Sequence, residues 1–201
     1  MRSAEEIRER YEKIRAQVGA GVSVVAATKY VSVEEMSVLA EAGIELVGEN
    51  RAQDLAVKHE SYAESFRWHF IGHLQSRKAP LVSELCELCH SLASESALAR
   101  LTIPALVEVN LSGEESKSGV SPEQLDGFLT RSVEAGVEVR GLMTMPPFVA
   151  DPEASRPYFQ RLRELAERFG LAELSMGTSQ DYLVAAEEGA TFVRVGSVLW
   201  S

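Results

Sequence analysis

Short apolar runs rich in β-branched and aliphatic residues alternate along the chain with stretches whose apolar residues recur every three or four positions. The runs are typical of buried parallel strands, and the stretches are typical of amphipathic helices. We predict eight strands, at residues 22–27, 44–47, 68–71, 88–92, 105–110, 137–143, 171–176 and 191–195. We predict helices between them, at residues 33–42, 52–61, 77–85, 95–101, 122–135, 152–169 and 180–188. This alternation indicates an α/β fold with a parallel sheet.

Two α/β architectures compete for this pattern. A doubly wound open sheet usually has a glycine-rich phosphate loop after its first strand, whereas residues 26–30 read Ala-Ala-Thr-Lys-Tyr. Eight strand-plus-helix units in 201 residues suit a compact (β/α)8 TIM barrel instead. Residues 1–17 add a helix, because Ile7, Tyr11 and Ile14 recur at helical spacing among charged residues. We therefore expect residues 1–201 to form one TIM-barrel domain with an extra N-terminal helix and no closing helix after the last strand.

Charge and composition exclude several classes of partner. The chain has 30 acidic and 20 basic residues, a formal net charge of -10, whereas nucleic-acid and anionic-membrane binders need a basic face. No stretch approaches the roughly 18 uninterrupted apolar residues of a membrane span. The N-terminal residues lack the apolar run of a signal peptide, and two cysteines cannot form the disulfide framework of a secreted protein. We expect a cytoplasmic protein that binds neither nucleic acid nor membrane.

Two basic residues stand out at predicted strand ends, where TIM barrels carry their chemistry. An ammonium at Lys29, on the rim of an apolar barrel, would be desolvated, which lowers a lysine pKa and favours Schiff-base formation with aldehydes. The alternative is a lysine that leaves the strand into solvent. Arg194 lies within a Phe-Val-Arg-Val run. It either points into the barrel, where a guanidinium must find a partner, or forms a helix-covered salt bridge outside.

Glycine and hydroxyl residues cluster after the last two predicted strands. Residues 175–179 read Ser-Met-Gly-Thr-Ser, and Gly196 and Ser197 follow the final run. Such segments present N–H and O–H donors to a phosphate, and barrels often bind phosphate at this place. Alternatively, Ser179 caps a helix and the glycines form turns.

Two motifs with metal or redox spacing have simpler explanations. Residues 86–90 read Cys-x-x-Cys-His, the spacing of c-type haem attachment, but residues 88–92 have the pattern of a buried strand. We therefore expect two buried structural thiols there. His69 and His73 have the spacing of a helical zinc pair, but a strand end lies between them, and we expect no metal site.

Several sequence blocks resemble the pyridoxal 5′-phosphate (PLP) homeostasis proteins of the YggS/PROSC type. The most specific are Gly-Glu-Asn at residues 48–50 and His-Phe-Ile-Gly-His-Leu-Gln at residues 69–75. Further matching blocks are at residues 24–29, 109–112, 117–119, 140–143, 174–177 and 193–197. The resemblance implies a barrel like the N-terminal domain of alanine racemase, of the PLP fold type III, with PLP as cofactor at its C-terminal mouth.

The resemblance also implies roles for individual residues. Lys29 would be the Schiff-base lysine, and Arg194 would face the pyridine nitrogen. Because a guanidinium cannot accept a proton at working pH, this arginine would weaken PLP as an electron sink and disfavour transaminase chemistry. The other cofactor-binding residues would be Asn50 near the cofactor and, around the phosphate, Ser175, Gly177, Ser179, Gly196 and Ser197.

The implied function is that of a PLP carrier in vitamin B6 and amino-acid homeostasis, without robust turnover. Such a protein would exchange PLP with PLP-dependent apoenzymes, as a monomer or weak dimer. The alternative is a small PLP-dependent enzyme such as a weak amino-acid racemase. A full alanine racemase adds a second β domain, for which we expect no room in 201 residues. The chain departs from the family pattern at Thr178, Gln180, Ala93 and Tyr30.

Overall fold

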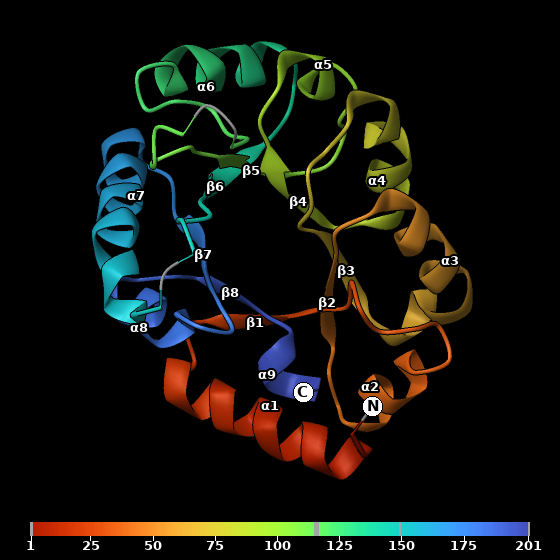
Figure 1. Ribbon diagram of the computed structural model, residues 1–201. Helices are drawn as coiled ribbons and strands as arrows, with labels where there is room; N and C mark the ends of the chain where they lie inside the picture. The colour runs from red at the N-terminus through yellow and green to blue at the C-terminus, as the bar shows by residue number, and fades with distance from the viewer. Residues whose placement is uncertain (1, 115–116, 149, 201) are drawn as a thin grey trace.

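In the computed structural model, eight parallel strands form a closed barrel surrounded by helices (Figure 1). The structure describes residues 2–114, 117–148 and 150–200. The strands are β1 (Ser23–Ala27), β2 (Leu46–Glu49), β3 (Arg67–Phe70), β4 (Leu88–Leu92), β5 (Ala105–Glu108), β6 (Val139–Met143), β7 (Glu173–Thr178) and β8 (Phe192–Val195). The last strand pairs with the first, with Arg194 beside Val25, so no sheet edge remains open. The closed order confirms the TIM barrel and rules out the open sheet.

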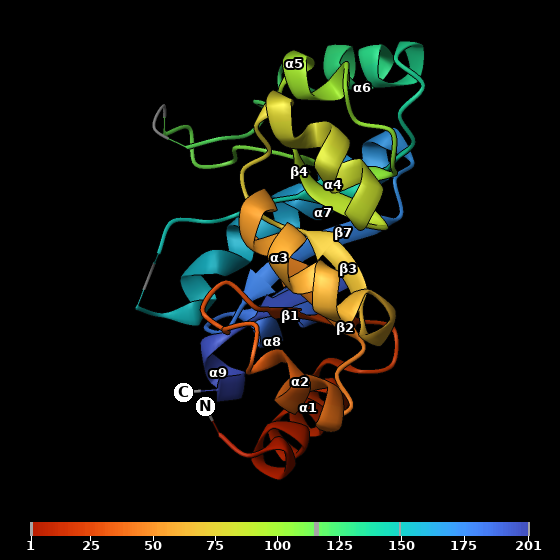
Figure 2. The ribbon, with the colours of Figure 1, turned by 90° about the vertical axis from the view of Figure 1, so that its right-hand side faces the viewer.

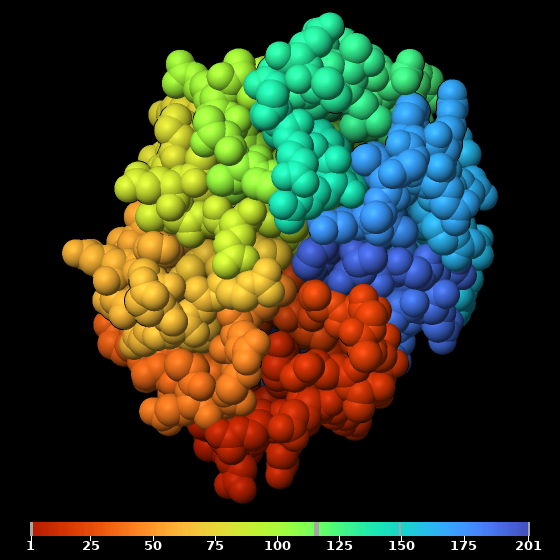
Figure 3. Space-filling model, turned by 180° about the vertical axis from the view of Figure 1, so that it is seen from behind, coloured from red at the N-terminus to blue at the C-terminus, as the bar shows by residue number. Residues whose placement is uncertain are grey.

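Most helices follow the strands in chain order around the outside of the barrel, whereas the first helix precedes β1 and the short last helix lies beside it (Figure 1). They are α1 (Ala4–Val18), α2 (Met36–Glu41), α3 (Ala52–Tyr62), α4 (Ala79–Leu85), α5 (Glu95–Leu98), α6 (Leu125–Glu134), α7 (Arg156–Phe169), α8 (Tyr182–Glu187) and α9 (Ser197–Trp200). Three 3-10 turns, η1 (Ala63–Ser65), η2 (Ser76–Lys78) and η3 (Pro152–Ser155), supplement them. Seen from behind, the chain also proceeds around the molecule in sequence order (Figure 3).

The extra N-terminal helix is present as α1, and its predicted apolar positions are buried. Ser3 begins it with a capping box, in which its hydroxyl accepts from the Glu6 N–H while the Glu6 carboxylate accepts from the Ser3 N–H. Arg10 Nη1 of this helix donates to the carbonyl of Val198, near the C-terminal end of the chain, at 3.0 Å. The helix thus brings the two ends of the sequence into contact.

The expectation that no helix follows the last strand is wrong, because residues 197–200 form the single turn α9. Leu199 is fully buried, and its N–H donates to the Gly196 carbonyl at 2.8 Å. Packing of this apolar side chain, together with the contact from Arg10 of α1, holds a turn that has too few residues to show helical periodicity.

Several helices begin later than predicted. Ser32 and Glu35 exchange capping hydrogen bonds as their spacing suggests, but the enclosed residues form a turn and α2 begins only at Met36. The helix predicted from residue 152 opens instead as the 3-10 turn η3 before α7. None of the helices described is long and apolar enough to cross a bilayer.

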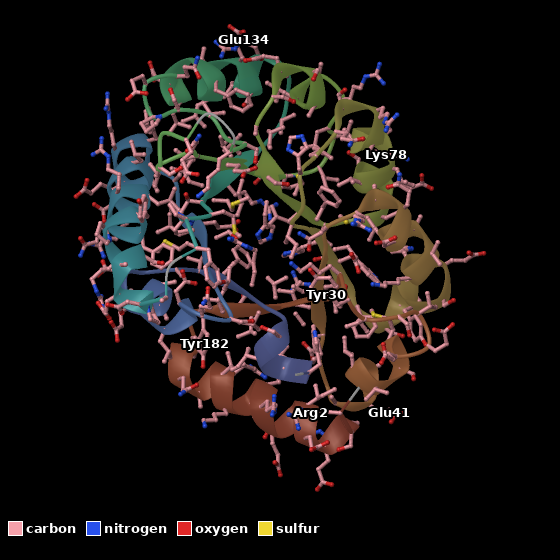
Figure 4. The ribbon with its side chains drawn as sticks, viewed as in Figure 1. Arg2, Tyr30, Glu41, Lys78, Glu134 and Tyr182 are labelled. Carbon is pink, nitrogen blue, oxygen red and sulfur yellow. The ribbon has the colours of Figure 1, made fainter. Side chains whose placement is uncertain are left out.

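The loops after the strands extend to one side of the barrel, where α9 also lies (Figure 2). This side faces the viewer in Figure 1 and forms the mouth of the barrel. Side chains occupy the space inside the ring of strands (Figure 4).

Candidate functional site

A cavity of about 370 Å³ opens at the mouth of the barrel. Residues from the ends of β1, β2, β7 and β8 surround it, and the segment after β6 contributes Met145 and Phe148. Six of the eight predicted cofactor residues line it, namely Lys29, Asn50, Ser179, Arg194, Gly196 and Ser197. Ser175 and Gly177 lie outside the lining. The carboxyl ends of strands far apart in sequence thus converge on one site.

Lys29 lies at the outer edge of this cavity. The sequence left two positions open for its ammonium, desolvated at the rim or extended into solvent, and the structure has the second, because the residue is exposed. Its Nζ lies 4.8 Å from the ring centroid of Tyr30, which is itself 82% exposed. Figure 4 shows Tyr30 near β2 at the mouth. The lysine therefore remains accessible from solvent and is held by a cation–π contact rather than by burial.

Arg194 points inward from β8 and is buried. Its Nη1 donates to the Ser175 hydroxyl, and its Nη2 donates to the Thr144 carbonyl at 3.0 Å and lies 2.9 Å from Met145 Sδ. Burial lowers the pKa of the guanidinium to about 10, so it keeps its charge at neutral pH. Of the two orientations that the sequence left open, the structure has the inward one.

Ser175 lies behind Arg194 and connects it to two buried histidines. The Ser175 Oγ is 2.7 Å from His90 Nδ1, and His90 Nε2 is 2.9 Å from His69 Nδ1. Burial lowers the pKa of His69 to about 3 and that of His90 well below its usual value. Both rings are therefore neutral at pH 7. The sequence placed His69 in a matching family block and in a metal-like spacing, and His90 in a haem-like spacing, but it did not predict their contact with each other across β3 and β4.

Ser179 and the β8–α9 turn form a set of donors at the cavity wall. The Ser179 Oγ accepts from the N–H of Gly196 at 3.0 Å and from the N–H of Val198 at 3.4 Å. Next to it, Asp181 Oδ1 accepts from the N–H of Thr178 at 2.7 Å and from its hydroxyl at 3.1 Å. The hydroxyl of Ser179 thus occupies backbone donors that could equally bind an anionic oxygen.

Gly177 shapes this wall without lining it. Its φ of 88° lies in the left-handed region, where the β7–β8 register shifts between Ser175 and Thr178. A Cβ at this position would approach the Ala185 Cβ of α8 to 2.5 Å. Only glycine allows this strand to bend while α8 packs so closely against it.

Asn50 contributes an unused acceptor. Its Oδ1 is buried and has no hydrogen-bond partner among the described residues. The backbone of Asn50 passes so close to Gly72 that an added Cβ at Gly72 would lie 1.9 Å from the Asn50 carbonyl oxygen. A buried, unpaired acceptor in a cavity wall is unfavourable unless a water molecule or a ligand group satisfies it.

A buried ion pair behind Lys29 and Asn50 went unnoticed in the sequence. The Lys58 ammonium pairs with Glu49 and donates to the Thr28 carbonyl at 2.8 Å. Glu49 also accepts from the Thr28 hydroxyl at 2.7 Å and from the Asn50 N–H at 3.0 Å. This cluster fixes the ends of β1 and β2 relative to each other. Its sequence signal is a lysine three residues after Leu55, on the inner face of α3.

The cysteine motif behaves as a pair of buried thiols. Cys86 and Cys89 are free and buried, and burial raises the pKa of both, that of Cys89 to about 11. No group of three or more histidine, cysteine or carboxylate side chains in the described part of the chain is arranged to hold a metal ion.

Comparison with known protein families identifies the barrel. The family described as "Alanine racemase, N-terminal domain" matches residues 3–201. A pyridoxal phosphate homeostasis protein from Aquifex aeolicus is 38% identical over 212 residues, which cover 96% of this chain and 93% of that protein. Another protein of that name, from Deinococcus radiodurans, is 38% identical over 189 residues, which cover 90% of this chain and 89% of that protein.

Solved structures give the same result. PipY from Synechococcus elongatus PCC7942, solved with PLP bound, has a TM-score of 0.88 and 29% identity, and the match covers 97% of this chain and 100% of that one. A lysine/ornithine decarboxylase from Vibrio vulnificus has a TM-score of 0.76 at 15% identity, and the match covers 98% of this chain and 62% of that one. At that identity the decarboxylase shows the fold alone.

Proposed function

Because the chain belongs to the pyridoxal phosphate homeostasis proteins, whose barrel is that of the alanine racemase N-terminal domain, we propose that it binds PLP at the mouth and carries it reversibly. The observation that supports this most is one cavity of about 370 Å³ that brings together Lys29, Arg194 and the Gly196–Ser197 turn. An amine, a fixed cation and a set of N–H and O–H donors match the aldehyde, ring and phosphate of PLP.

The residues present fit the cofactor. The unpaired Asn50 Oδ1 offers an acceptor inside the cavity, and the N–H groups now bound to Ser179 offer donors for a phosphate. When bound, PLP would supply an electrophilic aldehyde carbon. Lys29 Nζ would hold the group through that carbon with loss of one water, and the addition of water would release it again.

Arg194 favours a role as a PLP carrier over a role as an enzyme that turns over a substrate. Its guanidinium has no lone pair to accept a proton, so it keeps a facing pyridine nitrogen unprotonated and limits the electron-withdrawing power of the ring. The exposed position of Lys29 leaves the tether accessible to water and to a recipient. We infer that residues 1–201 act as one PLP-binding unit that exchanges its cofactor with PLP-dependent apoenzymes.

Borohydride trapping tests the site. The protein incubated with PLP should absorb at about 420 nm. Borohydride reduction followed by peptide mass spectrometry should then find a pyridoxyl group on Lys29. Lys29→Ala should abolish the band, whereas Lys13→Ala, on the exposed face of α1, should leave it unchanged. A reducible band that persists in Lys29→Ala refutes the assignment.

Two further measurements separate a carrier from an enzyme. A carrier should activate a PLP-dependent apoenzyme while free PLP is removed by a phosphatase, and Lys29→Ala should fail to do so. Incubation with L-amino acids in deuterated water should leave the α-hydrogen in place, because a racemase must exchange it.

A further inference from the structure

The buried hydrogen bonds behind Arg194 run through four side chains, from β8 through β7 and β4 to β3. Arg194 contacts Ser175, Ser175 contacts His90, and His90 contacts His69. Ser175 and His90 are 0% exposed and His69 is 2% exposed. The Phe192 ring packs edge-on against both imidazoles, at centroid distances of 5.7 and 5.1 Å. This chain of side chains is therefore sheltered from water.

The proton positions along the chain follow from its chemistry. A guanidinium only donates, so the Ser175 oxygen accepts from Arg194. The remaining partner of the Ser175 hydroxyl in the described residues is His90 Nδ1, and a buried hydroxyl hydrogen needs an acceptor. His90 Nδ1 is then unprotonated, and its Nε2–H donates to His69 Nδ1. Both histidines are assigned as neutral Nε2–H tautomers. In each hydrogen bond of the chain, the side chain nearer to Arg194 is the donor.

This arrangement has a particular electrostatic effect. The neutral His90 ring accepts the Ser175 hydroxyl hydrogen, which leaves the Ser175 oxygen free to accept from Arg194. Neither histidine places a negative charge near the guanidinium. A carboxylate in the same place would pair with the guanidinium and cancel most of its field. Ser175, which is held by His90, and the Thr144 carbonyl, which accepts from Nη2, thus fix the plane of the guanidinium together, and neither contact neutralises its positive charge at the cavity.

We propose that His90, acting through Ser175, is a positioning residue that fixes the Arg194 guanidinium in its orientation toward the cofactor ring. The proposal rests on the proposed function for the identity of the ligand. The arrangement itself belongs to this chain's own residues and can be tested without PLP. It also gives Ser175 a role behind the cavity, distinct from the phosphate contact that the sequence resemblance implies.

The first test measures the tautomers in the protein without PLP. Long-range ¹H–¹⁵N NMR correlations of ¹⁵N-histidine-labelled protein should show His90 and His69 with protonated Nε2 and unprotonated Nδ1 at pH 7. A protonated Nδ1 on His90 overturns the proposal, since Ser175 would then have no acceptor for its hydroxyl hydrogen. This measurement needs no variant, so a folding defect cannot obscure it.

The second test measures the order of Arg194 by hydrogen exchange at its Nη groups. His90→Leu removes the acceptor for Ser175, whereas His90→Asn keeps an oxygen near the position of Nδ1. We expect exchange in His90→Leu to be about tenfold faster, a factor that corresponds to about 1.4 kcal/mol, and exchange in His90→Asn to stay near the native rate. Ser132→Ala, which removes another fully buried hydroxyl in α6, serves as the control and should leave Arg194 unchanged. Equal exchange in His90→Leu and the native protein overturns the proposal.

The PLP-loaded protein gives an independent readout. The band near about 420 nm should move or change its pH dependence in His90→Leu and be restored in His90→Asn. An unchanged band in His90→Leu, with PLP bound, contradicts the proposed orientation of Arg194. If the native protein forms no reducible band at all, the proposed function fails, while the NMR result still decides the hydrogen-bond chain.

Discussion

Replacing Lys58 by methionine should destabilise the barrel more than any exposed lysine substitution. The side chains of Lys58 and Glu49 are only 6% and 0% exposed, so the substitution leaves a buried carboxylate without its cation. Removal of one partner from a buried ion pair costs about 3–5 kcal/mol. Glu49 keeps the hydrogen bonds from the Thr28 hydroxyl and the Asn50 N–H, so we expect the lower end, about 3 kcal/mol. For a chain of this size that loss lowers Tm by about 6–12 °C.

Urea unfolding followed by circular dichroism measures this loss. Lys13→Met is the matched control, because it makes the same change at an exposed position of helix α1 and should alter stability by less than about 0.5 kcal/mol. The double variant Glu49→Gln/Lys58→Met should be more stable than Lys58→Met alone, since it no longer buries an unpaired charge. A loss below about 1 kcal/mol in Lys58→Met, or a double variant less stable than the single one, would refute the reasoning.

Three other outcomes follow from buried groups. Burial lowers the pKa of His69 and His90 in the folded state, so below about pH 6.5 the unfolded chain binds more protons, and the free energy of unfolding should fall by about 1.4 kcal/mol per pH unit for each histidine. Urea titrations at pH 7, 6 and 5 check this, and a flat profile contradicts it. Thiol reagents should modify Cys86 and Cys89 only after unfolding, because burial raises the pKa of both thiols and excludes the reagent; immediate modification of the native protein would show that they are accessible. Gly177→Ala should cost about 2 kcal/mol or more, measured by urea unfolding against Gly21→Ala as control, where an added Cβ meets nothing within 4 Å.

The barrel could be predicted because its strands are buried on both faces. Runs such as Val24 to Ala26 are fully apolar and short, which separates them from the longer periodic segments that become helices. Boundaries were less accurate. The ends of helices such as α2 and α7 depend on local turns and 3-10 geometry, which leave the apolar periodicity unchanged.

The cavity lining was largely predictable for a topological reason. In a parallel barrel the carboxyl ends of all strands meet at one face, so polar residues after each predicted strand end necessarily come close together. Ser175 and Ser179 show the limit of this rule. Both lie in one short segment, but the register shift near Gly177 turns Ser175 toward the inside of the barrel and Ser179 toward the mouth.

Two other features were not predicted from the sequence, namely the burial of a charged lysine and the direction in which another lysine side chain points. Lys58 has a residue type that is almost always exposed, and only its three-dimensional proximity to Glu49 makes its burial favourable. The exposure of Lys29 depends on which way one side chain leaves a strand end, which apolar patterning does not specify.

The cavity is complete only when β1 and β8 pair and close the barrel. The wall combines Lys29, just after the first strand, with Arg194 in the last one, and these positions approach each other only when Val25 pairs with Arg194 across the seam. A partly folded chain with an open seam has no such wall. Any ligand that bridges the two strands therefore binds the closed state alone, and by linkage its concentration raises the stability of the seam. The apparent affinity for such a ligand therefore depends on the fraction of molecules in which the barrel is closed.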